Sequence, residues 1–472
     1  MTKDETTQGQ KTFDRRNVLK TGGNLLAAAA LFKAAGAVVP GGAWAAGSEG
    51  LEKTDLTLGI IPLTDCAPLV IAHEKGHFAK YGIKSRISKE ASWANIRDKV
   101  SIGALDAAHM LAGMPIAASL GIGAIKKPTI TSYSMDLNGN AITVSNELYD
   151  RMMEADPEAM TEKPISARAL KKVIDADRAA GQAPMTFAMV FPVSTHNYEL
   201  RYWMADAGID PDNDIRLIVI PPPQMVANLQ AKNIVGYCVG EPWNERAVIA
   251  GIGKVLITNY EIWNNNPEKV VGVNLDWAEK NPNTHMAMIR ALVEAAQWMD
   301  NPENRLEVVD IISRKSYVNA PVDVVKMSMT GTFRYSMDEE PRPLPDFNVF
   351  YRYAATFPWK SHAAWFISQM IRWGQIDTPI DVLKTAGEVY RPDIYREAVK
   401  SIGIPVPAID WKTEGEHAGP WTLTDATAPI EMGPDRFFNG AVFDPSQVLS
   451  YIDGFKVKNL ALSIDDLSKF NT

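Results

Sequence analysis

The stretch LTLGIIPLTDCAPLVIAHEKGHFAKYGI, residues 56–83, decides the fold class of this chain. Its first six residues, 56–61, form an apolar run typical of a buried strand, and residues 68–83 have the mixed pattern of an amphipathic helix. The helix is expected to end at Gly82, because glycine often terminates helices. A strand followed by a covering helix is the repeating unit of α/β proteins, so the stretch predicts that class.

The same alternation continues along the chain. Further strands are expected at residues 84–88, 107–111, 128–133 and 141–145, with a helix at 95–103. A charged helical section follows at 146–185, and a second series of strands covers 186–191, 215–220 and 234–240. Residues 285–300 form the clearest amphipathic helix of the later part. This alternation predicts parallel sheets covered by helices.

Composition places the chain among ordinary globular proteins. It has 472 residues, 46% of them hydrophobic, and a mean hydropathy of -0.13. The net charge is -8 and the pI is about 5.5, without a long run of lysines and arginines. These features argue against a nucleic-acid or anionic-membrane surface. An anionic ligand would therefore need a local positive site.

The first 46 residues differ from the rest. The Arg15-Arg16 pair precedes the short apolar run 25–39, and Ala43-Trp44-Ala45 has the form of a cleavage site. Lys33 interrupts the apolar run, which is too short to span a membrane. We expect residues 1–46 to be a twin-arginine signal peptide and the mature chain to be soluble and periplasmic.

Cysteine, histidine and enzyme motifs leave little support for catalysis. Cys66 and Cys238 both lie in apolar runs and are expected to be buried free thiols. His73-Glu74-Lys75-Gly76-His77 matches the zinc-binding H-E-x-x-H motif, but it contains a lysine and a glycine and lacks a third ligand at a familiar spacing. No nucleophile elbow, phosphate-binding loop or C-x-x-C pair is present. We expect no catalytic residue, no metal and no cofactor.

Several longer motifs carry a family resemblance. The opening stretch, with the K-G-x-F pattern at residues 75–78, resembles the type II solute-binding proteins of ABC importers. Later blocks resemble the nitrate-binding proteins of the nitrate/nitrite/bicarbonate importer branch. These blocks are FPVSTHNYELRYW (191–203), IPPPQM (220–225), CVGEPWN (238–244), EIWNNNPEKVVGV (261–273), NPNTH (281–285), MTGTF (329–333) and DFNVFYRYAATFPW (346–359).

The resemblance implies a two-lobed α/β clamp. Each lobe would be a mostly parallel sheet flanked by helices, with the ligand in a partly buried cleft between lobes that close by hinge motion. It implies that residues 47–145 and 275–400 form lobe 1, that 146–274 form lobe 2, and that 401–472 are a C-terminal wrapping segment.

The resemblance also implies which residues bind the anion. The positions that match the family's contacts are Trp93, His196, Val239, Gly240, Lys269 and, less directly, Asn140, which stands where the family usually has glutamine.

Physical chemistry gives these residue types a common role. A planar monoanion that leaves water needs hydrogen-bond donors and an opposite charge. Trp93 offers an indole N–H and a flat ring face, and Lys269 offers the charge. His196 lies at a predicted helix start, where the dipole favours an anion, and Gly240 allows close approach of its backbone N–H. Taken alone, a histidine at a helix start is more often a cap or core residue.

Three functions remain open at this stage. The first is a monomeric periplasmic protein that binds nitrate or nitrite and delivers it to an ABC permease and its ATPase, without nucleic acid as a partner. The second is a bicarbonate-binding paralogue, whose relatives tend to carry an acidic residue, suited to a divalent cation, where Lys269 stands here. The third is a cytoplasmic nitrate-sensing regulator of the same fold, which the export signal disfavours.

Overall fold

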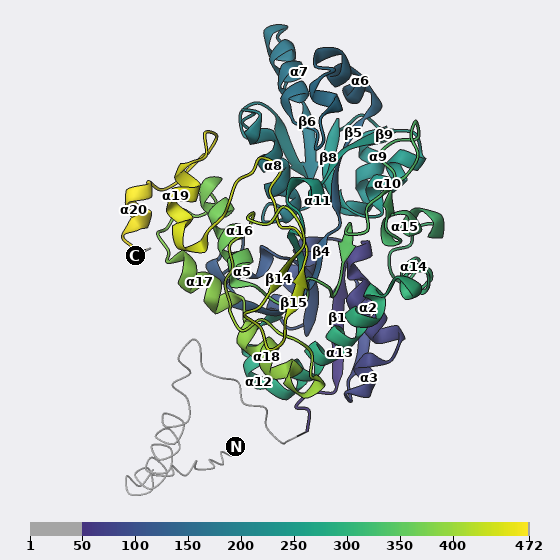
Figure 1. Cartoon of the computed structure of the whole chain (residues 1–472), viewed down its shortest axis with the longest axis vertical. Helices are drawn as coiled ribbons and strands as arrows, with labels where there is room; N and C mark the ends of the chain where they lie inside the picture. The colour runs from purple at the N-terminus through teal and green to yellow at the C-terminus, as the bar shows by residue number, and fades with distance from the viewer. Residues whose placement is uncertain (1–49, 471–472) are drawn as a thin grey trace, which may run out of the picture. The chain divides into compact units, whose positions relative to one another are not determined.

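Two mixed β-sheets form the frame of the chain, and the computed structural model describes residues 50–470 (Figure 1). The first sheet has the strand order β13-β4-β10-β3-β1-β2, and the second has the order β7-β6-β8-β5-β9. The first contains β1 (Asp55–Ile60), β2 (Lys84–Lys89), β3 (Ala107–Leu111), β4 (Thr129–Asn138), β10 (Pro267–Asn274) and β13 (Asn348–Val349). The second contains β5 (Asn140–Ser145), β6 (Thr186–Met189), β7 (Arg216–Val219), β8 (Gly236–Gly240) and β9 (Gly253–Thr258).

Helices precede, connect and cover these strands (Figure 1). In the first half of the chain they are α2 (Ala67–Glu74), α3 (His77–Lys80), α4 (Trp93–Ser101), α5 (Met114–Leu120), α6 (Asn146–Ala155), α7 (Arg168–Ala179), α8 (Thr195–Asp206) and α9 (Met225–Gln230). The next group is α10 (Trp243–Ile249), α11 (Asn259–Ile262), α12 (Leu275–Lys280), α13 (Pro282–Asp300), α14 (Arg305–Ile312) and α15 (Val322–Met329). The last group is α16 (Lys360–Arg372), α17 (Val382–Val389), α18 (Pro392–Val399), α19 (Val448–Asp453) and α20 (Ile464–Ser468).

Short elements complete the description. The 3-10 turns are η1 (Thr64–Cys66), η2 (Ala159–Thr161), η3 (Pro222–Gln224), η4 (Pro302–Asn304), η5 (Lys400–Ile402) and η6 (Pro445–Gln447). Two small ribbons pair β11 (Thr332–Phe333) with β12 (Arg342–Pro343) and β14 (Trp421–Leu423) with β15 (Ile430–Met432).

The predicted α/β class is confirmed, although the sheets are mixed rather than mostly parallel. In the first sheet β1 is parallel to β2 and β3, whereas β10 is antiparallel to β3 and β4. In the second, β6 is parallel to β7 and β8, whereas β5 is antiparallel to β8 and β9. The antiparallel members include β4, β5 and β10, which lie on either side of the two passages of the chain between the sheets. Alternation of strands and helices does not reveal such connecting strands.

The first passage is a backbone bend between β4 and β5. Asn138 ends β4 with φ 63° and Gly139 follows with φ 104°, after which Asn140 begins β5. Positive φ at two successive positions is tolerated by asparagine and glycine, so the sequence permits the bend. The change of sheet therefore occurs at Gly139, several residues before the boundary at 145 that the resemblance suggested.

The second passage lies between β9 and β10 and is joined to the first by asparagine side chains. Asn138 Nδ2 donates to Asn265 Oδ1 at 3.2 Å, and Asn266 Nδ2 donates to Asn138 Oδ1 at 3.0 Å. Asn259 completes the network, since its Oδ1 accepts from Asn140 N–H at 3.0 Å. The chain has returned to the first sheet by Pro267, which is earlier than the suggested boundary at 274.

The opening stretch forms a strand and two helices instead of a strand and one helix. Strand β1 is present, but α2 ends at Glu74 and Gly76, with φ 79°, separates it from α3. Glycine at this left-handed position ends the first helix earlier than the expected stop at Gly82. Cys66 and Cys238 are buried free thiols, as the sequence predicted.

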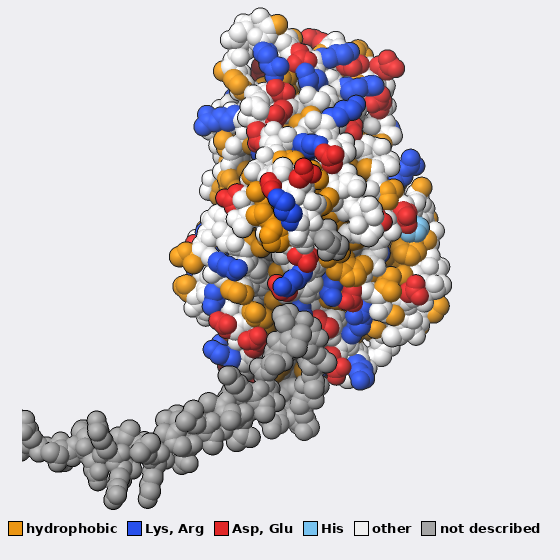
Figure 2. All heavy atoms as spheres, turned by 90° about the vertical axis from the view of Figure 1, so that its left-hand side faces the viewer, with side chains coloured by type: hydrophobic (Ala, Val, Ile, Leu, Met, Phe, Trp, Pro, Cys, Tyr) orange, Lys and Arg blue, Asp and Glu red, His pale blue; other side chains and the backbone are white. Residues whose placement is uncertain are grey.

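The expected signal peptide, residues 1–46, lies outside the described residues. Within residues 50–470, no helix combines the length and apolar character needed to cross a membrane. Figure 2 shows one face on which Lys and Arg side chains are interspersed with Asp and Glu, without a large area of one sign among the described residues.

The C-terminal segment packs against the second passage. The ring of Phe437 stacks on that of Trp263 with centroids 4.6 Å apart, and both side chains are fully buried. Two backbone hydrogen bonds flank this contact, from Asn264 N–H to Arg436 O and from Phe438 N–H to Ile262 O. Residues 436–438 therefore hold the segment that leads into β10.

We expect Phe437→Ala to lower the free energy of unfolding by about 3–5 kcal/mol, because it removes a fully buried aromatic ring from a packed stack. Urea denaturation of the purified chain measures the loss. Phe470→Ala is the matched control, since this ring is 51% exposed and its loss should change stability by about 0.5 kcal/mol or less. Equal effects of the two substitutions would contradict a structural role for the C-terminal segment.

Candidate functional site

A buried polar cluster lies where the two sheets meet, and it contains most of the predicted ligand residues. Trp93 is the first residue of α4, His196 the second of α8, and Lys269 lies in β10. All three side chains are at most 1% exposed. The expected partly buried cleft is therefore closed in this structure.

Local sequence explains why two helices begin at the cluster. Ser92 caps α4 by accepting a hydrogen bond from Asn95 N–H at 3.2 Å, and Ser194 caps α8 by accepting from Asn197 N–H at 3.0 Å. Trp93 and His196 thus occupy first turns, where the helix dipole is positive and favours a negative group.

Asn140 and Gly240 face each other across paired strands. They are register partners in β5 and β8. A Cβ at Gly240 would lie 3.2 Å from both Asn140 Oδ1 and Leu63 Cδ2, so a larger residue would require these two neighbours to shift slightly. Val239 precedes Gly240, and its carbonyl already accepts a hydrogen bond from Asn244 Nδ2 at 2.8 Å. Among the described residues, no hydrogen bond joins Val239 to the Lys269 ammonium.

Lys269 is paired with carboxylates that the sequence analysis did not assign to the site. Its Nζ lies 2.6 Å from Asp65 Oδ2 and also contacts Glu268 Oε1. The ammonium lies 5.7 Å from the centre of the Trp93 ring, which in turn packs edge-on against His109. The sequence predicted that Lys269 would offer its charge to a ligand in a partly buried cleft. In the structure Lys269 is instead the centre of a buried ion-pair network.

Asp65 is the carboxylate that the network keeps ionised. Besides Lys269, its Oδ1 lies 3.0 Å from His109 Nε2, whose other ring nitrogen accepts a hydrogen bond from Ile61 N–H at 3.4 Å. His109 therefore carries its proton on Nε2, facing Asp65. Burial alone would raise the pKa of Asp65, but Lys269 and His109 outweigh it and hold the pKa well below its usual range.

Burial shifts the pKa values of other ionisable groups nearby. Burial, followed by the Asp65 charge, raises the pKa of Asp136 well above its usual value, although its Oδ1 accepts from Lys269 N–H at 3.0 Å. Burial also raises the pKa of Glu268, because Lys269 is shared with Asp65 and does not fully compensate it. The pKa of His196 lies well below its usual value, through burial and then through Lys269, so its ring is neutral near pH 7.

Several polar atoms of the cluster lack a hydrogen bond. Buried atoms with no hydrogen-bond partner among the described residues include Thr64 Oγ1, Trp93 Nε1, both amide atoms of Asn140 and both ring nitrogens of His196. Buried polar groups are normally satisfied, and a concentration of exceptions calls for an explanation. A small polar ligand between these atoms would supply the missing partners.

Sequence reasoning overlooked Thr64, Asp65 and Glu268 for identifiable reasons. Thr64 and Asp65 lie in η1, a few residues after the carboxyl end of β1, where α/β sheets commonly bind ligands, but their stretch was used to assign the fold. Glu268 adjoins Lys269 in the Asn-Pro-Glu-Lys motif, and neighbouring residues of a strand normally point to opposite faces.

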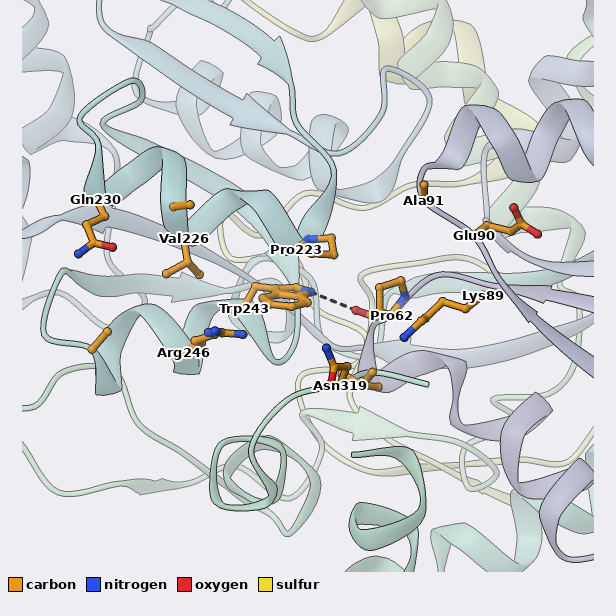
Figure 3. A pocket seen from close by; sticks show the side chains of 13 residues that line it. Pro62, Lys89, Glu90, Ala91, Pro223, Val226, Gln230, Trp243, Arg246 and Asn319 are labelled. Carbon is orange, nitrogen blue, oxygen red and sulfur yellow. Dashed lines mark hydrogen bonds between the residues drawn. The ribbon is translucent and has the colours of Figure 1, made fainter. Parts of the chain in front are cut away.

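Figure 3 shows the side chains that line a groove of about 770 Å³. Pro62, Glu90 and Ala91 line one side, and Val226, Trp243 and Arg246 line the other. Trp243 Nε1 donates across it to Pro62 O at 3.1 Å, and Thr64 N–H donates to Glu241 O at 2.8 Å. None of the six predicted ligand residues lines the groove.

The two histidines of the zinc-like motif have separate partners. His73 Nδ1 lies 2.8 Å from Ser85 Oγ, whereas His77 lies 3.6 Å from Glu294 across the break at Gly76. Among residues 50–470, no group of three or more His, Cys, Asp and Glu side chains is arranged to hold a metal ion.

We expect Lys269→Met to lower the free energy of unfolding by about 3–5 kcal/mol, because Asp65 would remain buried and ionised without its cation. Guanidinium denaturation of the unliganded chain tests this. Lys469→Met removes an exposed ion pair with Asp466 and should leave stability unchanged. A lysine lining an open cleft would instead give two variants of equal stability.

Known proteins resemble this chain in sequence and in fold over most of its length. Residues 49–313 match the NMT1-like family. The nitrate/nitrite binding protein NrtA of Synechococcus elongatus is 35% identical over 466 residues, which cover 94% of this chain and 98% of that protein. The crystal structure of the periplasmic nitrate-binding protein NrtA from Synechocystis PCC 6803 superimposes with a TM-score of 0.76 at 31% identity, covering 87% of this chain and 100% of that one.

A longer relative matches over part of its length. The nitrate import ATP-binding protein NrtC of Synechocystis sp. is 39% identical over 415 residues, or 88% of this chain. The match spans 57% of NrtC, so the chain corresponds to little more than half of that protein.

Proposed function

This chain belongs to the NMT1-like family, and we propose that it is a periplasmic solute-binding protein that binds nitrate, and nitrite with it, for an ABC importer. It is homologous to NrtA proteins over most of its length, so the family resemblance drawn from the motifs is correct. Its partners would be a membrane permease and an ATPase, to which a monomer delivers the anion without a chemical reaction.

The observation that carries this proposal is the set of unpartnered buried groups around the Lys269 ammonium. Trp93 Nε1 and the His196 ring offer donors from two helix starts, and Asn140 Nδ2 offers a third from β5. A planar oxyanion has oxygen acceptors in several directions and one negative charge, which these donors and the dipoles can stabilise in a dry site. The ligand would contact Trp93, Asn140, His196, Gly240 and Lys269, with Val239 contributing through its backbone.

Bicarbonate is a second candidate because of the carboxylates beside Lys269. Nitrate accepts hydrogen bonds but has no proton to donate, whereas bicarbonate has one O–H. Glu268 Oε2 has no hydrogen bond among the described residues, so it could accept that O–H. Nitrate remains favoured because Lys269 stands where a carboxylate would help to hold a divalent cation, and an ammonium would repel it.

Calorimetric titration of the mature chain with nitrate, nitrite and bicarbonate tests the assignment, and we expect saturable binding of nitrate. In Trp93→Phe the affinity for nitrate should fall by tenfold to a hundredfold, since a donor to a charged group contributes about 1.5–3 kcal/mol. Because Trp93 is buried and the smaller ring of Phe leaves a cavity, the unliganded variant should melt at a lower temperature, and the titrations are run where both chains are folded.

Trp373→Phe is the matched control for this titration. Its indole N–H is also buried without a partner, but it lies at the end of α16 and stacks against Arg372. Nitrate affinity should stay at the wild-type value in this variant. Tight binding of bicarbonate with no response to nitrate would replace the first assignment by the second.

Export by the twin-arginine route is the remaining part of the proposal. We expect replacement of both Arg15 and Arg16 by lysine to retain the precursor in the cytoplasm, because the paired arginines are the signal that this route reads. Immunoblotting of periplasmic and cytoplasmic fractions measures the distribution. Normal amounts of mature protein in the periplasm would show that the chain uses another route, and its absence from wild-type periplasm would favour a cytoplasmic sensor.

A further inference from the structure

The side chain of Glu268 lies between two groups assigned to the ligand. Its Oε1 contacts Lys269 Nζ and lies 3.5 Å from His196 Nε2. An oxygen of a bound oxyanion that accepts from both Lys269 and His196 would have to occupy the same place. In this closed structure a carboxylate of the chain itself holds that position.

A β-bulge explains how neighbouring residues reach the same space. The pairing of β10 with β4 shifts in register between Pro267 and Lys269 and again between Lys269 and Val270. A bulge changes the direction of side chains that a regular strand would send to opposite faces. The backbone of Glu268 is fixed on its other side, where its carbonyl accepts from Ala112 N–H at 3.1 Å.

The charge on Glu268 is poorly compensated. The side chain is fully buried, and its second oxygen, Oε2, has no hydrogen bond among the described residues. The Lys269 ammonium, which it contacts, also lies 2.6 Å from Asp65. One ammonium cannot neutralise both carboxylates, so protonation of one of them lowers the electrostatic cost of the cluster.

We propose that Glu268 competes with the anion for Lys269 and His196, and that a nitrate ion binds together with one proton taken from solvent by the displaced Glu268 carboxylate. No bond within the ligand is made or broken. Glu268 changes from carboxylate to carboxylic acid, and the site gains one anion and one proton. Rejection of anions at high pH would then be a property of this residue, an inference that depends on the proposed function.

The other ionisable groups around Glu268 are less suited to this change. They are Lys269 on β10, Asp65 on η1, His109 on β3, Asp136 on β4, His196 and Glu199 on α8, and Cys238 on β8. Asp65 stays ionised because its pKa is depressed, while burial raises the pKa of Asp136, Glu199 and Cys238 well above their usual values and so shifts them toward their protonated forms. His109 and His196 are neutral because burial lowers their pKa.

The direction of the pH effect follows from linkage. Burial already raises the pKa of Glu268 in the free chain, and a nitrate ion beside it would raise the pKa further. Affinity for nitrate should therefore be highest and constant below the pKa of the free chain. It should fall by about tenfold per pH unit between the free and liganded pKa values, as one proton is taken up on binding.

The test compares wild type with Glu268→Gln by calorimetry between pH 5 and pH 8, in two buffers of different ionisation enthalpy. The amide matches the protonated acid in shape and cannot ionise. We expect the wild type to take up as much as one proton per nitrate ion, and the Gln variant to take up none. At pH 8 the variant should bind nitrate about tenfold more tightly than wild type, or better, with an affinity independent of pH.

Two controls separate the possible failures. Glu245→Gln removes a buried carboxylate of α10 outside the Lys269 cluster, and it should keep wild-type proton uptake and affinity. If Glu268→Gln does not fold, proton uptake by the wild type alone decides, and its absence overturns the inference. Equal or weaker nitrate binding by a folded Glu268→Gln at pH 8 also overturns it. Failure of the wild type to bind nitrate at any pH overturns the proposed function itself.

Discussion

The buried Lys269 ammonium, shared by Asp65 and Glu268, is the interaction on which the rest of the site depends. Its ion pairs hold η1 and β10 together in one cluster. They therefore join the turn after β1 to the strand that follows the second passage between the sheets. Because these side chains are buried, each unpaired group among them has a high electrostatic cost. A ligand that supplies the missing partners of these groups would remove this cost and bind more tightly for that reason.

Both passages between the sheets lie next to this cluster. Asn140 follows the bend at Gly139, and Lys269 follows the turn at Asn265 and Asn266, which hydrogen bonds to Asn138. Groups that we propose to bind the anion thus lie next to the segments that connect the two sheets. The hydrogen bonds of Trp243 with Pro62 O and of Thr64 with Glu241 O join the segments that follow β8 and β1.

The carboxylates beside Lys269 make anion binding depend on a proton, which hydrogen-bond donors alone would not do. Donors at two helix starts and one ammonium favour any small oxyanion, but Glu268 already fills part of that role. Selectivity would then depend on whether the incoming ligand brings a proton, as bicarbonate does, or takes one from solvent, as nitrate would. Affinity and pH dependence become properties of one cluster rather than of separate residues.

Apolar periodicity and contiguous motifs are local signals, so the α/β class, most strands, the buried thiols, the family and six candidate residues could be predicted from the sequence. Five of the six candidates lie in or beside the Lys269 cluster, yet their binding role stays a prediction. Only the tertiary structure decided that Lys269 is buried and paired, and that Asp65, distant in sequence, is its partner. It also revealed the bulge that turns Glu268 toward His196, because register and charge pairing arise from long-range packing and leave no local pattern.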